Sequence, residues 1–223
     1  MSSQAENQAN VKFSYKKYYS FRNKINTKFS ERFRSDMRID FVMRSLLYGD
    51  TQPAVVVSTN PLLIGAYSDE MDAVVMLQFP KEFADQYNLS VGTRLTTSNV
   101  YFNGASVADD IHVGEKYSRQ YADFVPIVQL FLGKKDEKIM EKVKLFNENV
   151  WQTVSEKADE YVRLYPNRAR DGFFYFKWYS IGKSVEDCSG CGSLRRNGGQ
   201  KLELSDDDKV AVNEYLEKFF EHV

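Results

Sequence analysis

Cysteine, histidine, proline and long apolar runs are all scarce in this sequence of 223 residues. Its two cysteines, Cys188 and Cys191, cannot form a framework of several disulfides, so a hydrophobic core must hold the fold together. No apolar run approaches the roughly 18 residues that a membrane-spanning helix needs, and the polar N-terminus lacks the apolar stretch of a secretory signal. We therefore expect a cytoplasmic protein with no part in a membrane.

A large excess of charge of either sign is also missing. The chain has 30 lysines and arginines against 31 aspartates and glutamates, which excludes a uniformly basic nucleic-acid-binding protein. Hydrophobic residues make up 43% of the chain and aromatic residues 14%, which excludes a disordered chain. A protein of this size buries enough apolar surface to fold without disulfides or metals.

The charge is nevertheless uneven along the chain. Residues 11–44 contain ten lysines or arginines and three aspartates or glutamates, a net charge of +7, which leaves a net charge of −8 for the rest. Aromatic residues are interspersed among the basic ones in the first part of this segment. We expect residues 1–29 to form a basic aromatic arm, partly disordered or docked, and residues 30–223 to form a single domain.

Short apolar runs, bounded by proline, glycine, asparagine or aspartate, predict strands. The link between the second and third runs is only five residues long, short enough for a hairpin with antiparallel strands. We therefore predict an α+β fold with a small, mostly antiparallel sheet of about four to five strands. The expected strands lie at residues 54–57, 62–67, 73–79, 93–102 and 173–179.

Apolar residues that recur every three or four positions predict several helices. The longest covers residues 134–165, where a single apolar stripe runs along an otherwise charged helix. At a rise of 1.5 Å per residue it would be roughly 45 Å long, so one end would project from a small domain or meet another subunit. The other expected helices lie at residues 30–49, 81–87 and from Ser205 onward.

The pair Cys188 and Cys191 is a candidate zinc site, and zinc is the one cofactor that the sequence suggests. Two thiolates separated by two residues on a turn can share a tetrahedral zinc ion. A closed site needs about four ligands, and the weak candidates for the remaining positions are His112, His222 and Asp187. Two reduced thiols in a surface loop and a regulatory disulfide are the alternative interpretations.

The sequence contains no intact phosphate-binding loop, dinucleotide-binding fingerprint, nucleophile elbow or H-E-x-x-H pair. Acidic residues instead gather in two expected loops, at residues 69–72 and 109–115. If these loops converged, their carboxylates and one imidazole could bind Mg²⁺ or Mn²⁺ and activate a water for hydrolysis. A metal-dependent hydrolase is therefore an alternative function. Its candidate residues are Asp69, Glu70, Asp72, Asp109, Asp110, His112 and Glu115.

A second alternative is a protein that binds single-stranded nucleic acid through residues 11–44 and the glycine- and arginine-containing loop 182–201. Basic side chains neutralise phosphates, and aromatic rings stack on unpaired bases. The same composition also suits an arm that is docked on its own acidic body. The candidate nucleic-acid-binding residues are Lys16, Lys17, Arg22, Lys24, Lys28, Arg195 and Arg196.

Because no catalytic signature is intact, we expect first a non-enzymatic binding or regulatory protein that acts through protein–protein contacts. Immunity-type inhibitors and accessory subunits are proteins of this class. The expected partner is another protein or a second copy of the same chain, reached through the long helix or the charged arm. No catalytic residue can be named from the sequence.

Overall fold

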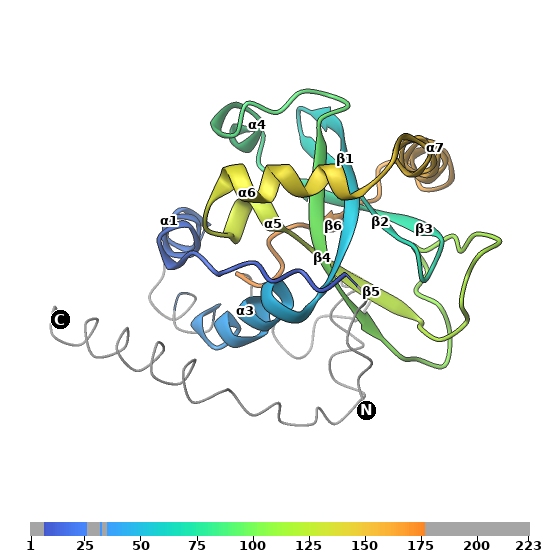
Figure 1. The fold of residues 1–223 in the computed structure, drawn as a ribbon, viewed down its shortest axis with the longest axis horizontal. Helices are drawn as coiled ribbons and strands as arrows, with labels where there is room; N and C mark the ends of the chain where they lie inside the picture. Colours follow the sequence, from blue (N-terminus) through green and yellow to red (C-terminus); the bar gives the residue numbers. More distant parts are fainter. Residues whose placement is uncertain (1–6, 26–31, 33–34, 177–223) are drawn as a thin grey trace, which may run out of the picture. The chain divides into compact units, whose positions relative to one another are not determined.

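A computed structural model describes residues 7–25, 32 and 35–176 (Figure 1). All the described residues belong to one compact unit. Helices combine there with a curled, mixed sheet, which confirms the predicted α+β class. None of the described helices is both long enough and apolar enough to span a membrane.

The sheet has six strands in the order β5-β4-β1-β2-β3-β6. All neighbouring strands pair antiparallel except β3 and β6, which pair parallel. The expected hairpin is present, since Ser68 pairs with Ala73 and Leu62 with Phe79. The strands are β1 (Asp50–Thr59), β2 (Leu62–Ser68), β3 (Ala73–Phe79), β4 (Arg94–Phe102), β5 (Asp123–Val128) and β6 (Arg170–Asp171).

One face of the sheet is covered by α7 (Glu148–Leu164), which packs on β1, β2 and β3. Val154 and Ala158 of this helix join a small apolar cluster with alternate residues of these strands. Gly65 of β2 allows the close approach, because a Cβ atom at this position would lie 3.0 Å from the Cβ atom of Ala158.

The opposite face of the sheet carries the larger apolar core, to which five of the described helices contribute buried residues. Rings from distant parts of the chain meet there, with centroids 4.7 Å apart for Phe21 and Phe83 and 4.9 Å apart for Phe79 and Phe131. Because each aromatic side chain buries a large apolar area, this cluster stabilises the contact between the helices and the sheet. The helices are α1 (Tyr15–Ile25), α3 (Ile39–Tyr48), α4 (Glu82–Gln86), α5 (Gln129–Leu132) and α6 (Asp136–Glu141).

The prediction of one long helix over residues 134–165 is matched only roughly, because the segment is not one continuous helix. The segment contains α6 (Asp136–Glu141), the short 3-10 helix η1 (Lys142–Leu145) and then α7. The backbone is extended at Asn147, whose side chain accepts a hydrogen bond from the amide of Val150 at 3.1 Å. Asn147 therefore caps a new helix, and α7 is only about 26 Å long at 1.5 Å per residue.

Other predictions are matched only roughly. The sheet has six strands, whereas four to five were expected. The strand β5 was not expected because it contains Pro126, although an edge strand tolerates a proline. The strand β6 was not expected because it has only two residues. Residues 173–176 form turns where a strand was expected. In the segment 30–49, α3 begins only at Ile39, after a turn. The helix expected from Ser205 lies outside the described residues.

Candidate functional site

The basic arm lies against the body along the described residues 8–25. Backbone hydrogen bonds join the amide of Val11 to the carbonyl of Leu46 at 2.9 Å and the amide of Ser14 to the carbonyl of Leu132 at 2.7 Å. Three aromatic side chains of this segment are buried in the core: Phe13, Tyr18 and Phe21. These rings therefore hold the arm in place, and in this structure they present no face to a nucleotide base.

The half-buried Tyr15 and Tyr19 are also engaged within the protein. Their rings stack with centroids 6.4 Å apart, and the guanidinium carbon of Arg22 lies 4.3 Å from the centroid of Tyr19. The hydroxyl of Tyr15 donates a hydrogen bond to the sulfur of Met43 at 3.2 Å. Intramolecular contacts thus occupy both rings, which weakens the expectation that the arm stacks on bases.

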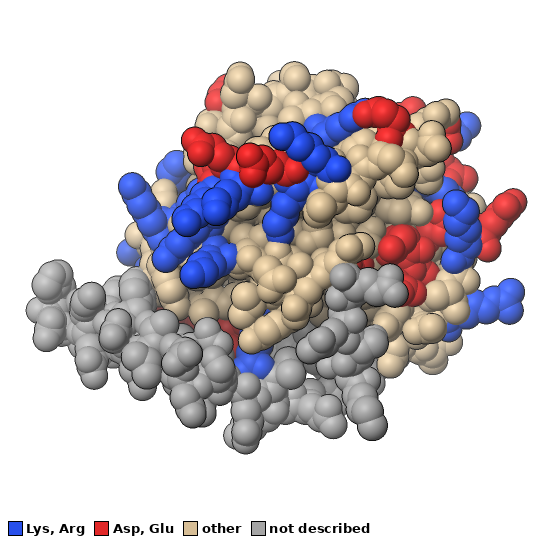
Figure 2. Space-filling view, viewed as in Figure 1, with Lys and Arg blue, Asp and Glu red and all other residues tan. Residues whose placement is uncertain are grey.

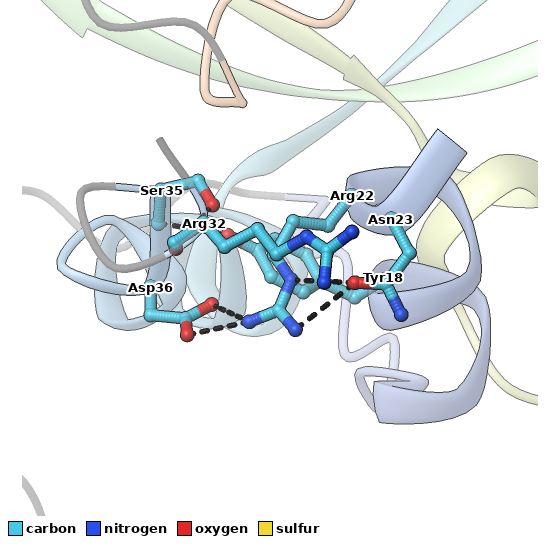
Figure 3. A network of polar contacts seen from close by, with 6 residues as sticks. All are labelled: Tyr18, Arg22, Asn23, Arg32, Ser35 and Asp36. Carbon is cyan, nitrogen blue, oxygen red and sulfur yellow. Dashed lines mark hydrogen bonds and ion pairs between the residues drawn. The ribbon is translucent and has the colours of Figure 1, made fainter. Parts of the chain in front are cut away.

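Arg22 fixes the arm to the segment that precedes α3, as Figure 3 shows. Its Nη1 atom donates to both carboxylate oxygens of Asp36, at 2.7 and 2.5 Å, and only 7% of its side chain is exposed. The Tyr18 hydroxyl donates to the carbonyl of Ser35 at 2.8 Å. Burial outweighs the attraction of Arg22 and raises the pKa of Asp36 above its usual value. Arg22 is therefore a structural residue.

A second basic segment, residues 134–144, lies beside the arm. The Lys134 amide donates to the Lys12 carbonyl at 2.7 Å, and Lys17 Nζ lies 2.6 Å from Asp136 Oδ1. Figure 2 shows lysine and arginine side chains gathered over α1 and α6. We call the exposed lysines of the two segments the lysine surface: Lys12, Lys16, Lys24, Lys134, Lys135, Lys138 and Lys144.

The lysine surface carries a concentrated positive charge. Residues 7–25 and 134–144 together contain ten basic and three acidic residues, a net charge of +7, whereas the other described residues have a net charge of −6. None of the seven exposed lysines forms an ion pair with a described residue. Their charge is therefore not neutralised within the part of the chain that the structure describes.

The sequence-based candidates for nucleic-acid binding divide into three groups. Lys16 and Lys24 belong to the lysine surface, whereas Lys17 and Arg22 are held by Asp136 and Asp36. Lys28, Arg195 and Arg196 lie outside the described residues. Sequence reasoning missed residues 134–144, because their lysines were assigned to the solvated side of one long helix. The signal was five lysines within eleven residues.

The two acidic loops converge, as the hydrolase alternative required. The Ser118 amide donates to the Glu70 carbonyl at 2.9 Å, and the Gly114 amide donates to the Met71 carbonyl at 3.3 Å. We call residues 69–72, 109–119 and 156–160 together the acidic surface. It contains nine acidic and three basic residues, a net charge of −6.

Helix α7 supplies the third segment of the acidic surface. Nε2 of His112 lies 3.8 Å from Oε1 of Glu160, and Nζ of Lys157 lies 3.8 Å from Oδ2 of Asp72. These contacts place residues 156–160 beside both acidic loops. The acidic side chains of this surface that are exposed or half-buried are Asp69, Glu70, Asp109, Glu115, Glu156, Asp159 and Glu160.

The buried carboxylates of these loops are engaged by protein groups rather than gathered around an ion. Asp72 accepts hydrogen bonds from the Tyr67 hydroxyl at 2.9 Å and from the Lys116 amide at 3.2 Å. Among residues 7–25, 32 and 35–176, no three side chains of His, Cys, Asp or Glu lie close enough together to hold a metal ion. His112 is exposed beside Glu160. The zinc candidates Cys188, Cys191, Asp187 and His222 lie outside the described residues.

Arg170 forms a buried ion-pair cluster with Asp110 and Asp123. Its Nε and Nη2 atoms donate to Asp110 at 2.6 and 2.7 Å, and Nη2 lies 2.9 Å from Asp123 Oδ1. Burial favours the protonated, neutral form of both Asp110 and Asp123. At Asp110 the hydrogen bonds and charge of Arg170 prevail and lower the pKa, whereas at Asp123 burial prevails and the pKa is raised. The cluster joins β5, β6 and the loop that includes Asp110.

A further polar cluster lies where β1 begins and where β2 and β4 end. Asp50 Oδ2 accepts hydrogen bonds from Gln52 Nε2 at 2.6 Å and from the Tyr101 hydroxyl at 3.2 Å, and that hydroxyl lies 3.5 Å from Asp69 Oδ1. Burial, together with the negative charges of Asp69 and Glu70, raises the pKa of Asp50 to about 6. Asp50 can therefore take up a proton near neutral pH, a property that its sequence context did not indicate.

Comparison with known proteins gives no match: no family model, no curated protein and no solved structure is similar to this chain.

Proposed function

We propose that this chain is a non-enzymatic binding protein and that the lysine surface is its contact with an anionic macromolecular partner. The observation that carries the proposal is the set of seven exposed lysines without an ion-pair partner among the described residues. They come from two segments, residues 7–25 and 134–144, which backbone hydrogen bonds place side by side. Like charges at this density repel one another, and an anionic partner relieves that repulsion.

The chemistry of the surface supports recognition by charge rather than by base stacking. Phe13, Tyr18 and Phe21 are buried, and Arg22, the arginine of the described arm, is paired with Asp36. The lysines that remain are compact, hydrated charges on flexible side chains, so they contact carboxylates or phosphates without a fixed geometry. Binding of this kind weakens steeply as salt is added.

The alternative of a metal-dependent hydrolase gains less support. The acidic loops converge, but Tyr67 and the Lys116 amide engage Asp72, and Arg170 engages Asp110. Carboxylates that already accept short hydrogen bonds would have to lose them before they could bind Mg²⁺.

Fluorescence anisotropy with labelled anionic probes tests the proposal. The probes are a short single-stranded DNA, the corresponding duplex and poly-L-glutamate, each titrated at low and at high salt. The variant Lys16→Glu/Lys138→Glu changes one residue of each basic segment. We expect it to weaken binding of any probe by about tenfold or more, because it introduces two repulsive contacts.

The matched control is Lys81→Glu/Arg163→Glu, which alters two exposed basic residues outside the lysine surface. It changes the net charge of the protein by the same amount, so it separates local contact from total charge. An equal loss of binding in both variants, or binding that does not change with salt, would contradict the proposal.

A further inference from the structure

We propose that the partner of the lysine surface is the acidic surface of a second copy of this chain, so that copies associate head to tail. This inference rests on the proposed function, because it names the anionic partner that the lysine surface binds.

The two surfaces are complementary in charge. The segments that carry the lysine surface have a net charge of +7, and the acidic surface has a net charge of −6. Contact between copies would neutralise both at once. Oppositely charged patches also attract one another before contact, which raises the association rate at low salt and fixes the orientation of approach.

The lysine surface and the α7 segment of the acidic surface lie on opposite sides of the sheet, whereas the two acidic loops pack on the larger core through Met71 and Ile111. Buried residues of α1 and α6 belong to the larger core, whereas α7, which supplies residues 156–160, covers the other face. In Figure 1, α1 and α6 accordingly lie on one side of the strands and α7 lies on the other. The sheet therefore separates the α7 segment of the acidic surface from the lysine surface of the same copy, and contact between these two is made between copies.

Each surface also contains a minority of the opposite charge, which favours a protein partner over a nucleic acid. Asp136, Glu137 and Glu141 lie within the basic segment 134–144. Each of these carboxylates would repel a uniformly charged phosphate backbone. The acidic surface likewise includes three basic residues. In a contact between the two surfaces, these basic residues can pair with the carboxylates of segment 134–144, which would fix how the two copies align. These basic residues are Lys116, Arg119 and Lys157.

Sedimentation velocity of the full chain over a range of concentrations is the first test. At low salt we expect the sedimentation coefficient to rise with concentration, and at high salt we expect it to stay constant, because salt screens charges on exposed surfaces. Since unlike surfaces meet, the association is heterologous, and it continues beyond a dimer unless the copies close into a ring.

A charge-swap experiment tests which surfaces meet. Lys16→Glu/Lys138→Glu reverses part of the lysine surface, and Glu115→Lys/Asp159→Lys reverses part of the acidic surface. All four side chains are exposed, so both variants should keep the fold, which circular dichroism checks. We expect each variant alone to sediment as a monomer at low salt. An equimolar mixture should associate, because each variant retains the surface that the other has lost.

The possible results separate this inference from the proposed function. If the unaltered chain binds an anionic probe but stays monomeric at every salt concentration, the inference is overturned and the proposed function stands. If it neither binds a probe nor associates, both are overturned. If it associates but the mixed variants do not, the contact lies elsewhere on the protein and the inference is again overturned.

Discussion

At the scale of single residues, Asp50 lies where burial opposes ionisation. Its pKa in the folded protein is about 6, above the ordinary value of 3.8, so the folded state binds the proton more tightly than the unfolded chain does. This contribution to stability is complete below about pH 4 and is lost as the pH rises through about 6. The charged carboxylate therefore destabilises the fold at neutral pH.

Asp50→Asn should accordingly raise the free energy of unfolding at pH about 8, by about 3 kcal/mol. The amide cannot ionise, and its oxygen can still accept the bonds from Gln52 and Tyr101. Urea unfolding on both sides of pH 6 measures the change, with the exposed Asp85→Asn as control. A variant that keeps the full pH dependence would show that Asp50 is not its source.

The ion-pair cluster of Arg170 supports a second prediction about a single residue. Arg170→Met should lower the free energy of unfolding by about 3–5 kcal/mol, because it leaves two buried carboxylates, Asp110 and Asp123, without their cation. Arg170→Lys should recover only a small part, since one ammonium group cannot replace contacts made by Nε, Nη1 and Nη2. Urea unfolding measures both, and full recovery by lysine would argue against this geometry.

At the scale of elements, the contact between β2 and α7 depends on the absence of a side chain at Gly65. Gly65→Ala should cost about 1–3 kcal/mol, because the new methyl group would lie 3.0 Å from that of Ala158. Adding Ala158→Gly removes the closest of the new contacts, so the double variant should be more stable than the sum of the two single changes implies. A double-mutant cycle of unfolding free energies measures this coupling, and strictly additive effects would refute the close contact.

The helices and strands also show which parts of the fold can be predicted from local sequence patterns. Short apolar runs and turn residues were enough to predict β2, β3, their hairpin and β4, because these strands follow one another along the chain. The break in the helical segment at Asn147 was missed, since an asparagine beside Glu148 also fits the solvated side of a continuous helix. The strand β6 could not be predicted either, because its two residues pair with β3, far away in sequence.

At the scale of the whole molecule, the sequence predicted the positive charge of the arm but not which residues would display it. Tertiary contacts decide this, because Asp36 and Asp136 engage Arg22 and Lys17, whereas Lys16 and Lys24 stay exposed. The joining of residues 134–144 to the arm, and of the acidic loops to each other, likewise depends on backbone contacts across the fold. Composition and spacing carry no information about such contacts.

The separation of the lysine surface on α1 and α6 from the acidic segment on α7, across one sheet, has a consequence for any assembly of this chain. A row of copies joined by unlike surfaces has polarity: one terminal copy displays lysines and the other displays carboxylates. Such a row can therefore add copies at both ends but can be blocked at each end by a different inhibitor. A variant with only one surface reversed would act as a cap that stops growth at a single end.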